Sequence, residues 1–112
     1  MHTVRFLLLA TCMLAGAAHA DPVPASKLAY VGHWQGQDME ITLHKDGKLL
    51  YKRNKPKFKA DLTLDVSGFD GNDFYAGVGP FRSTFVVSKP PSRVGKAWTM
   101  SVDGVELTKQ AQ

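Results

Sequence analysis

Two histidines with nearby carboxylates are the first candidates for chemistry. His33 and His44 flank Asp38 and Glu40 in the sequence. Imidazole nitrogens and carboxylate oxygens bind divalent cations when they converge on one point. Their spacing matches no known ligand motif, and the strand pattern directs both histidines away from the core. Two solvated histidines are therefore the favoured interpretation, and neither a metal ion nor a cofactor is predicted.

The remaining acidic residues also give no catalytic pairing. Asp61 and Asp65 share a strand face, but an acid–base pair needs a cleft, and the sequence indicates none. The run Asp70-Gly71-Asn72-Asp73 has ligands that calcium accepts, yet it lacks the later glutamate and is explained by a turn. No nucleophile elbow, zinc-protease motif or phosphate-binding glycine loop is present. We predict no catalytic residue and expect a non-enzyme, with a small hydrolase as a minor alternative.

A basic cluster is the strongest candidate for a binding surface. Seven lysines and arginines lie in the stretch from Lys45 to Lys59, and Asp46 is the only acidic residue in it. The candidate anion-binding rim consists of five of them, namely Lys52, Arg53, Lys55, Lys57 and Lys59. A rim of this charge suits an anionic lipid, lipopolysaccharide or an acidic protein. The alternative is that the lysines protect a strand edge and keep the protein soluble.

Alternating apolar and polar residues predict the elements that carry these groups. The clearest run has its apolar positions at Phe58, Ala60, Leu62, Leu64 and Val66. Similar alternation predicts strands over 28–35, 38–45, 48–54, 57–67, 74–79, 81–88 and 97–109, the last of which is itself a hairpin. Lys89 to Arg93, with two prolines, is the longest predicted loop. No helical period extends beyond the N-terminal segment.

Turn chemistry fixes two strand registers. A bulged turn at Gly47 pairs Ile41 with Tyr51 on the apolar face and Glu40 with Lys52 on the polar face. A two-residue Asp-Gly loop at Asp103 pairs Val102 with Val105. An antiparallel meander of seven to eight short strands results, apolar on one face. Without a covering helix it must close as a small barrel or, alternatively, fold as a β-sandwich.

The N-terminus has the features of a secretory signal peptide. A short basic start precedes an apolar run, and Ala18-His19-Ala20 is a small-x-small cleavage site. We expect a cleaved signal over 1–20, a flexible leader over 21–27, one β-barrel domain over 28–109 and a tail over 110–112. The single cysteine, Cys12, leaves with the signal. The periplasm or the extracellular space is the expected location, and no spanning segment is predicted.

Gly32 and Trp34 form a structural signature. Gly32-His33-Trp34 on the first strand, followed by a meander of hairpins, resembles the G-x-W opening of lipocalin-like barrels. That resemblance implies that Trp34 packs across the closed end of the barrel beneath a basic residue from a late strand, for which Lys109 is the candidate. The stretch from Tyr30 to Thr108 also resembles small secreted proteobacterial proteins of unassigned function.

These observations favour a non-enzymatic secreted or periplasmic binding protein. Its ligand is expected to be a small apolar or anionic-amphipathic molecule, held by the aromatic-rich interior or at the rim. The alternative is a protein-interaction module, a periplasmic inhibitor or envelope factor, that uses the basic rim. Nucleic acid is not expected as a partner, because the chain is secreted and because Tyr51 and Phe58 are predicted to face the core.

Overall fold

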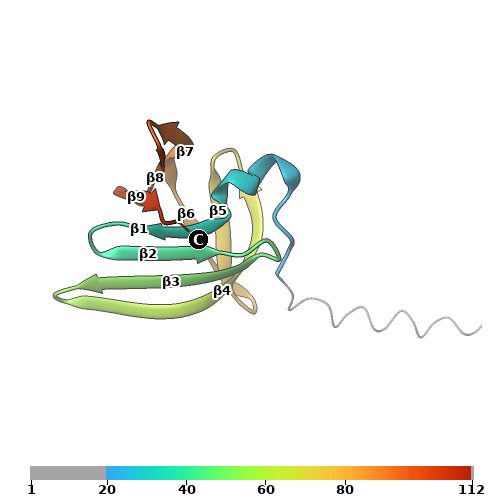
Figure 1. Ribbon diagram of the computed structural model, residues 1–112. Helices are drawn as coiled ribbons and strands as arrows, with labels where there is room; N and C mark the ends of the chain where they lie inside the picture. The colour runs from blue at the N-terminus through green and yellow to red at the C-terminus, as the bar shows by residue number, and fades with distance from the viewer. Residues whose placement is uncertain (1–19, 112) are drawn as a thin grey trace, which may run out of the picture.

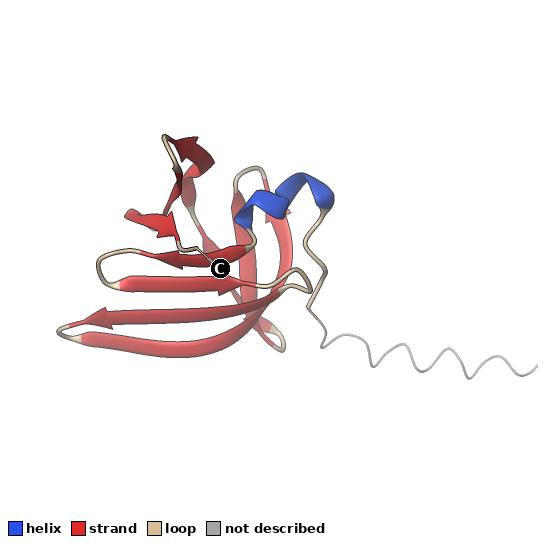
Figure 2. Ribbon diagram, viewed as in Figure 1, coloured by secondary structure: helices blue, strands red, loops and turns tan. Residues whose placement is uncertain are grey.

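The computed structural model describes residues 20–111. Apart from Ala20, the predicted signal peptide with Cys12 lies outside this range, as does Gln112. The described chain is built almost wholly of strands, with one short 3-10 helix near its start (Figure 2). Its elements are η3 (Ala25–Tyr30), β1 (Gly32–Gln35), β2 (Met39–Leu43), β3 (Lys48–Lys55), β4 (Phe58–Asp70), β5 (Asp73–Val78), β6 (Phe81–Phe85), β7 (Val87–Val94), β8 (Ala97–Val102) and β9 (Val105–Lys109). No helix in residues 20–111 is both long and apolar enough to cross a membrane.

All nine strands belong to one antiparallel sheet that curls into a half-barrel (Figure 1). The strand order is β6-β5-β4-β3-β2-β1-β9-β8-β7, so the first and last strands pair with each other. Trp34 lies opposite Lys109 in that pairing. The two free edges of the sheet are β6 and β7, which are consecutive in the chain. The all-β antiparallel meander is confirmed, with nine strands and a sheet left open between β6 and β7.

The predicted hairpin registers are confirmed. Ile41 lies opposite Tyr51, and Glu40 lies opposite Lys52. The bulged turn is present, because Gly47 has a φ of +94° and its N–H donates to the His44 carbonyl. Val102 pairs with Val105 across a two-residue loop. Turn chemistry and the polarity of facing residues were therefore enough to set these registers.

The start of the domain differs from the expectation. Residues 28–30 belong to η3 and do not begin the strand predicted over 28–35, and Leu28 is 44% exposed. The segment before η3 is also held against the sheet, because Val23 is buried and its N–H donates to the Lys45 carbonyl. The Tyr30 carbonyl accepts a 2.9 Å hydrogen bond from the Trp34 indole. Folding η3 over the sheet thereby gives the buried indole its partner.

The predicted loop over Lys89 to Arg93 is also wrong, because β7 runs through it. The strand tolerates its two prolines because it is a sheet edge, where a missing N–H breaks no hydrogen bond to a neighbour. Its pairing with β8 shifts register between Val87 and Lys89 and again between Lys89 and Ser92. Both irregularities let a proline-containing segment remain in the sheet.

The core lies on the concave side of the curled sheet. Trp34 is fully buried, as predicted from its place on the apolar face. The other core side chains are Val23, Tyr30, Met39, Ile41, Leu43, Leu49, Leu64, Val66, Phe74, Ala76, Phe85, Val87, Met100, Val102 and Leu107. Phe58 was expected on this core face but is 55% exposed, because it lies at the tip of the β3–β4 hairpin, beyond the part of the sheet that curls over.

Two aspartates hold the corner between β6 and β7. The Asp73 carboxylate accepts the backbone N–H of Val87 at 2.7 Å, and the Asp103 carboxylate accepts that of Val86 at 2.9 Å. The N–H of Asp103 in turn donates to the Val86 carbonyl at 2.7 Å. Hydrogen bonds to charged groups are stronger than neutral ones, so this corner is firmly placed although the strands that flank it do not pair.

Candidate functional site

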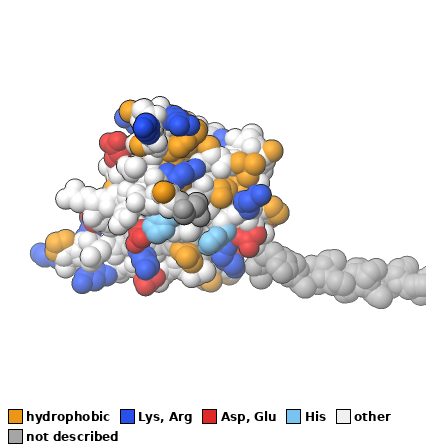
Figure 3. Space-filling model, viewed as in Figure 1, with side chains coloured by type: hydrophobic (Ala, Val, Ile, Leu, Met, Phe, Trp, Pro, Cys, Tyr) orange, Lys and Arg blue, Asp and Glu red, His pale blue; other side chains and the backbone are white. Residues whose placement is uncertain are grey.

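The five residues of the predicted rim lie on the β3–β4 hairpin, but on both of its faces. Lys52 and Lys59 occupy the outer face, while Arg53 lies on the same face as Tyr51 and the core. Lys55 is the last residue of β3, and Lys57 lies in the turn that follows. These residues are close together along the chain but do not share one face of the hairpin. On the side of the molecule drawn in Figure 3, Lys and Arg side chains occupy several separate places, with Asp and Glu side chains near some of them.

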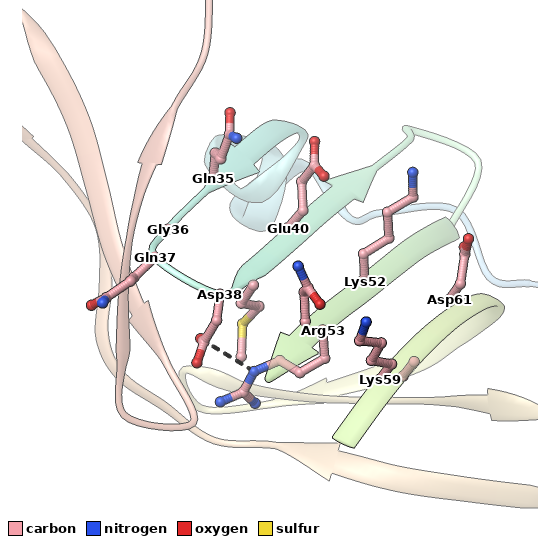
Figure 4. A pocket seen from close by; sticks show the side chains of 12 residues that line it. Gln35, Gly36, Gln37, Asp38, Glu40, Lys52, Arg53, Lys59 and Asp61 are labelled. Carbon is pink, nitrogen blue, oxygen red and sulfur yellow. Dashed lines mark ion pairs between the residues drawn. The ribbon is translucent and has the colours of Figure 1, made fainter. Parts of the chain in front are cut away.

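A polar hollow of about 530 Å³ brings some of these cations beside carboxylates (Figure 4). Three cations and three carboxylates line it, namely Lys52, Arg53, Lys59, Asp38, Glu40 and Asp61. Lys52 lies between Glu40 and Asp61 in the sheet, and the three side chains point to the same side. Nearby, Lys48 forms a 2.7 Å ion pair with Asp65. This part of the predicted rim therefore carries little excess charge.

Arg53 is largely buried on the inner face. Its side chain is only 12% exposed, and its Nε lies 3.4 Å from an Asp38 carboxylate oxygen. Its guanidinium also donates to the Tyr51 hydroxyl at 3.4 Å. The bond to Tyr51, and after it the charge of Asp38, raises the pKa of Arg53. Arg53 is thus engaged within the chain and is poorly placed to meet an external anion.

An apolar groove of about 600 Å³ lies at the open end of the half-barrel. Its principal apolar side chains are Tyr51, Leu62, Leu64, Val78, Phe81 and Phe85. Three of them are strongly exposed, with Leu62 at 46%, Val78 at 59% and Phe81 at 78%. Isolated exposed apolar residues are ordinary, whereas apolar residues that share one hollow indicate a binding surface.

The floor of the groove is an aromatic cluster. The rings of Phe74 and Phe85 stack with centroids 4.9 Å apart. Tyr51 meets Phe85 edge to face at 5.4 Å. Such contacts add to the stabilisation from burial and hold the rings in fixed orientations. The groove therefore has a rigid floor, whereas its outer wall, which is formed by β5 and β6, is more exposed.

One glycine determines how closely the strands of the outer wall approach. A Cβ at Gly77 would collide with the backbone carbonyl of Phe81 on the paired strand. Glycine at this position therefore permits β6 to lie close against β5 next to the groove.

An aromatic–cation stack lies where β1 and β9 pair. The Lys109 ammonium lies 5.0 Å from the Trp34 ring centroid and 5.5 Å from that of Trp98. It also donates to the Ala29 carbonyl at 3.0 Å. Burial lowers the pKa of Lys109. Gly32 contributes to this packing, since a Cβ there would lie 3.1 Å from the lysine side chain.

The histidines do not form a metal site. His33 lies 2.7 Å from the Glu40 carboxylate, which is its cross-strand diagonal neighbour. Within residues 20–111, no three His, Cys, Asp or Glu side chains are arranged to hold an ion. The turn carboxylates are used internally, because Asp70 accepts the Tyr75 hydroxyl and Asp73 accepts the Val87 N–H.

Sequence reasoning located the cations but missed the groove. Leu62 was expected to be core, and Phe81 to face inward like Phe85. The missed signal is length, since β4 has thirteen residues and its neighbour β5 only six. A long strand beside short ones leaves part of its apolar face uncovered.

Comparison with protein families, with curated proteins and with solved structures found no match for this chain.

Proposed function

We propose that the protein is a non-enzymatic binding protein for a small amphipathic anion. The apolar part of the ligand lies in the groove at the open end of the half-barrel, and its anionic group lies at the tip of the β3–β4 hairpin. The observation that carries this proposal is a gradient along one face of that hairpin, from buried apolar side chains to exposed cations.

The gradient follows from the register of β3 and β4. On the inner face, Leu49 pairs with Leu64, Tyr51 with Leu62, Arg53 with Ala60, and Lys55 with Phe58. Exposure is 8% at Leu64, 46% at Leu62 and 55% at Phe58, and the less exposed pair of Arg53 and Ala60 lies between Leu62 and Phe58. An acyl chain laid along this face would remove apolar surface from water on both partners, at about 25 cal/mol per Å².

The hairpin tip supplies the charge for the anionic group. Lys55 and Lys57 are exposed there, and the structure gives neither an ion pair. An exposed ion pair contributes only about 0.2–1 kcal/mol. The lysines would therefore orient the ligand, while the groove would supply most of the affinity.

The alternative of a protein-interaction module through the basic rim is less well supported. Lys52 already faces Glu40 and Asp61, and Arg53 is held by Asp38 and Tyr51. Of the rim residues, Lys55 and Lys57 at the tip lie outside the hollow lined by carboxylates, and Lys59 lies in it but is paired with Asn54 in the sheet. A small anionic group needs no more than this, whereas an acidic protein surface would need a broader cationic face.

The proposed setting is the periplasm or the extracellular space, after removal of a signal peptide near Ala20. Resemblance to lipocalin-like barrels through Gly32 and Trp34 agrees with binding in a curled sheet. Anionic lipids and lipopolysaccharide have the required combination of acyl chains and acidic groups. A free acyl carboxylate is the simplest probe of that chemistry.

The test is calorimetric titration with dodecanoate below its critical micelle concentration. Leu62→Gln and Phe81→Gln should each weaken binding about tenfold, because each removes apolar contact from the groove. The double change Lys55→Gln with Lys57→Gln should weaken it about threefold and abolish its salt dependence. The matched control is Lys89→Gln with Lys96→Gln, two exposed lysines on and after β7, which should bind like the unmodified protein.

Two results would contradict the proposal. One is that the unmodified protein does not bind dodecanoate. The other is that the groove variants bind as tightly as the control, which would place the ligand elsewhere.

A further inference from the structure

The edge strand β6 has unusual self-complementarity. Its sequence is Phe-Arg-Ser-Thr-Phe, with Ser83 at the centre and an aromatic residue at each end. One side of β6 pairs with β5, while the other side is a free edge of the sheet. Backbone N–H and carbonyl groups on a free edge form a template for another strand.

This edge has fewer of the devices that prevent pairing than the other free edge has. The other free edge, β7, carries Pro90 and Pro91 and two register shifts. β6 contains neither a proline nor a bulge in its pairing with β5. Its only charged residue, Arg82, is folded back over the Tyr75 ring, with the guanidinium 4.4 Å from the ring centroid. The contrast between the two edges indicates that β6 is left available.

We propose that β6 pairs with β6 of a second copy of this chain, antiparallel about a two-fold axis at Ser83. In that register Phe81 faces the second copy's Phe85, Arg82 faces Thr84, and Ser83 faces its own equivalent. Aromatic pairs and threonine-containing pairs favour antiparallel association, and no like charges lie directly opposite each other. Self-pairing of one surface about a two-fold axis is the usual form of a homodimer.

The apolar side chains near this edge support a second copy as the occupant. Phe81 is the most exposed large hydrophobic residue in the described chain, at 78%, and Val78 beside it is 59% exposed. Pairing of β6 would cover Phe81 with the aromatic end of the opposing strand. Because Phe81 and Phe85 both line the groove, the two grooves of the dimer would be adjacent across the new strand pair.

Sedimentation equilibrium without added ligand tests this inference separately from the proposed function. The unmodified protein should show a monomer–dimer equilibrium with concentration. Ser83→Lys places two like charges at the axis and should weaken dimerisation at least about tenfold, and Ser83→Asp should do the same. Ser83 is exposed, so either change leaves the monomer fold intact, which circular dichroism verifies. Mixing the two variants should restore a dimer, since lysine then faces aspartate.

The matched control is Ser92→Lys, an exposed serine on the other free edge. It should dimerise like the unmodified protein. A protein that stays monomeric at every concentration would overturn the proposal. So would a Ser83→Lys variant that dimerises as well as the Ser92→Lys control, or a mixture of the Ser83 variants that remains monomeric.

Discussion

The ammonium of Lys109 lies over the indole of Trp34, 5.0 Å from the ring centroid, and the two residues are direct partners in the pairing of β9 with β1. The first and last strands of the chain are therefore joined by backbone pairing and by a cation–aromatic contact.

Removing the indole of Trp34 should strongly destabilise the protein. Trp34 is fully buried, so Trp34→Ala should lower the free energy of unfolding by about 3–5 kcal/mol. Lys109→Gln should have a smaller effect, about 0.5–2 kcal/mol, because it removes only the cation–aromatic contact. Urea denaturation followed by tryptophan fluorescence or circular dichroism measures both. A Trp34→Ala variant as stable as Lys109→Gln would refute the assignment of Trp34 to the core.

The corner between β6 and β7 should depend on the carboxylate of Asp103. Asp103→Gly keeps the backbone free to adopt the observed φ of +49° but removes the oxygen that accepts the Val86 N–H. It should lower the free energy of unfolding by about 1.5–3 kcal/mol. Asp103→Asn keeps an acceptor oxygen and tolerates the same φ, so it should lose clearly less. Equal losses in the two variants would show that the carboxylate oxygen has no role at the corner.

Gly77 should tolerate no side chain. Gly77→Ala places a Cβ against the Phe81 carbonyl, so β6 must move away from β5 and the outer wall of the groove is displaced. Gly95→Ala is the matched control, because it meets no atom within 4 Å and suffers only from its φ of +65°. That strain should cost about 1 kcal/mol. Thermal unfolding should show a clearly larger loss for Gly77→Ala, and equal losses would mean that the close approach is absent.

Stability should fall at alkaline pH, in part through Tyr30. Burial, and after it the charge of Asp73, raises the pKa of this tyrosine. Above the ordinary tyrosine pKa of about 10, the unfolded chain loses the Tyr30 proton while the folded chain retains it, so rising pH favours unfolding. Tyr30→Phe should flatten the decline of the unfolding free energy above about pH 10 and leave the profile from pH 6 to 8 parallel to that of the unmodified protein. An unchanged alkaline slope would contradict this assignment.

Much of the fold could be predicted because it depends on local chemistry. The register at Gly47 followed from the need to keep Lys52 off the apolar face, and the loop at Asp103 followed from the Asp-Gly dipeptide. Residues 28–30 were assigned wrongly to a strand because their fold depends on a distant contact, the Tyr30 hydroxyl donating to the Asn72 carbonyl at 2.8 Å. Local spacing carries no information about such a partner.

The candidate site was only partly predictable for a related reason. Sequence clustering correctly placed five cations on one hairpin, but it could not show that Asp38 and Asp61 would lie beside Arg53 and Lys52. The groove depends on how far the curled sheet covers β4, which is a property of the whole barrel. Alternation identified Leu62 as an inward residue but could not show that nothing covers it.

The most direct test of the proposed function is an NMR titration of the protein with dodecanoate, recorded as backbone amide shifts. Binding in the groove predicts the largest changes at Leu62, Val78 and Phe81, with smaller ones at Lys55 and Lys57, and little change around His44 at the other end of the half-barrel. Changes confined to the His44 region, or no saturable changes at all, would contradict the account.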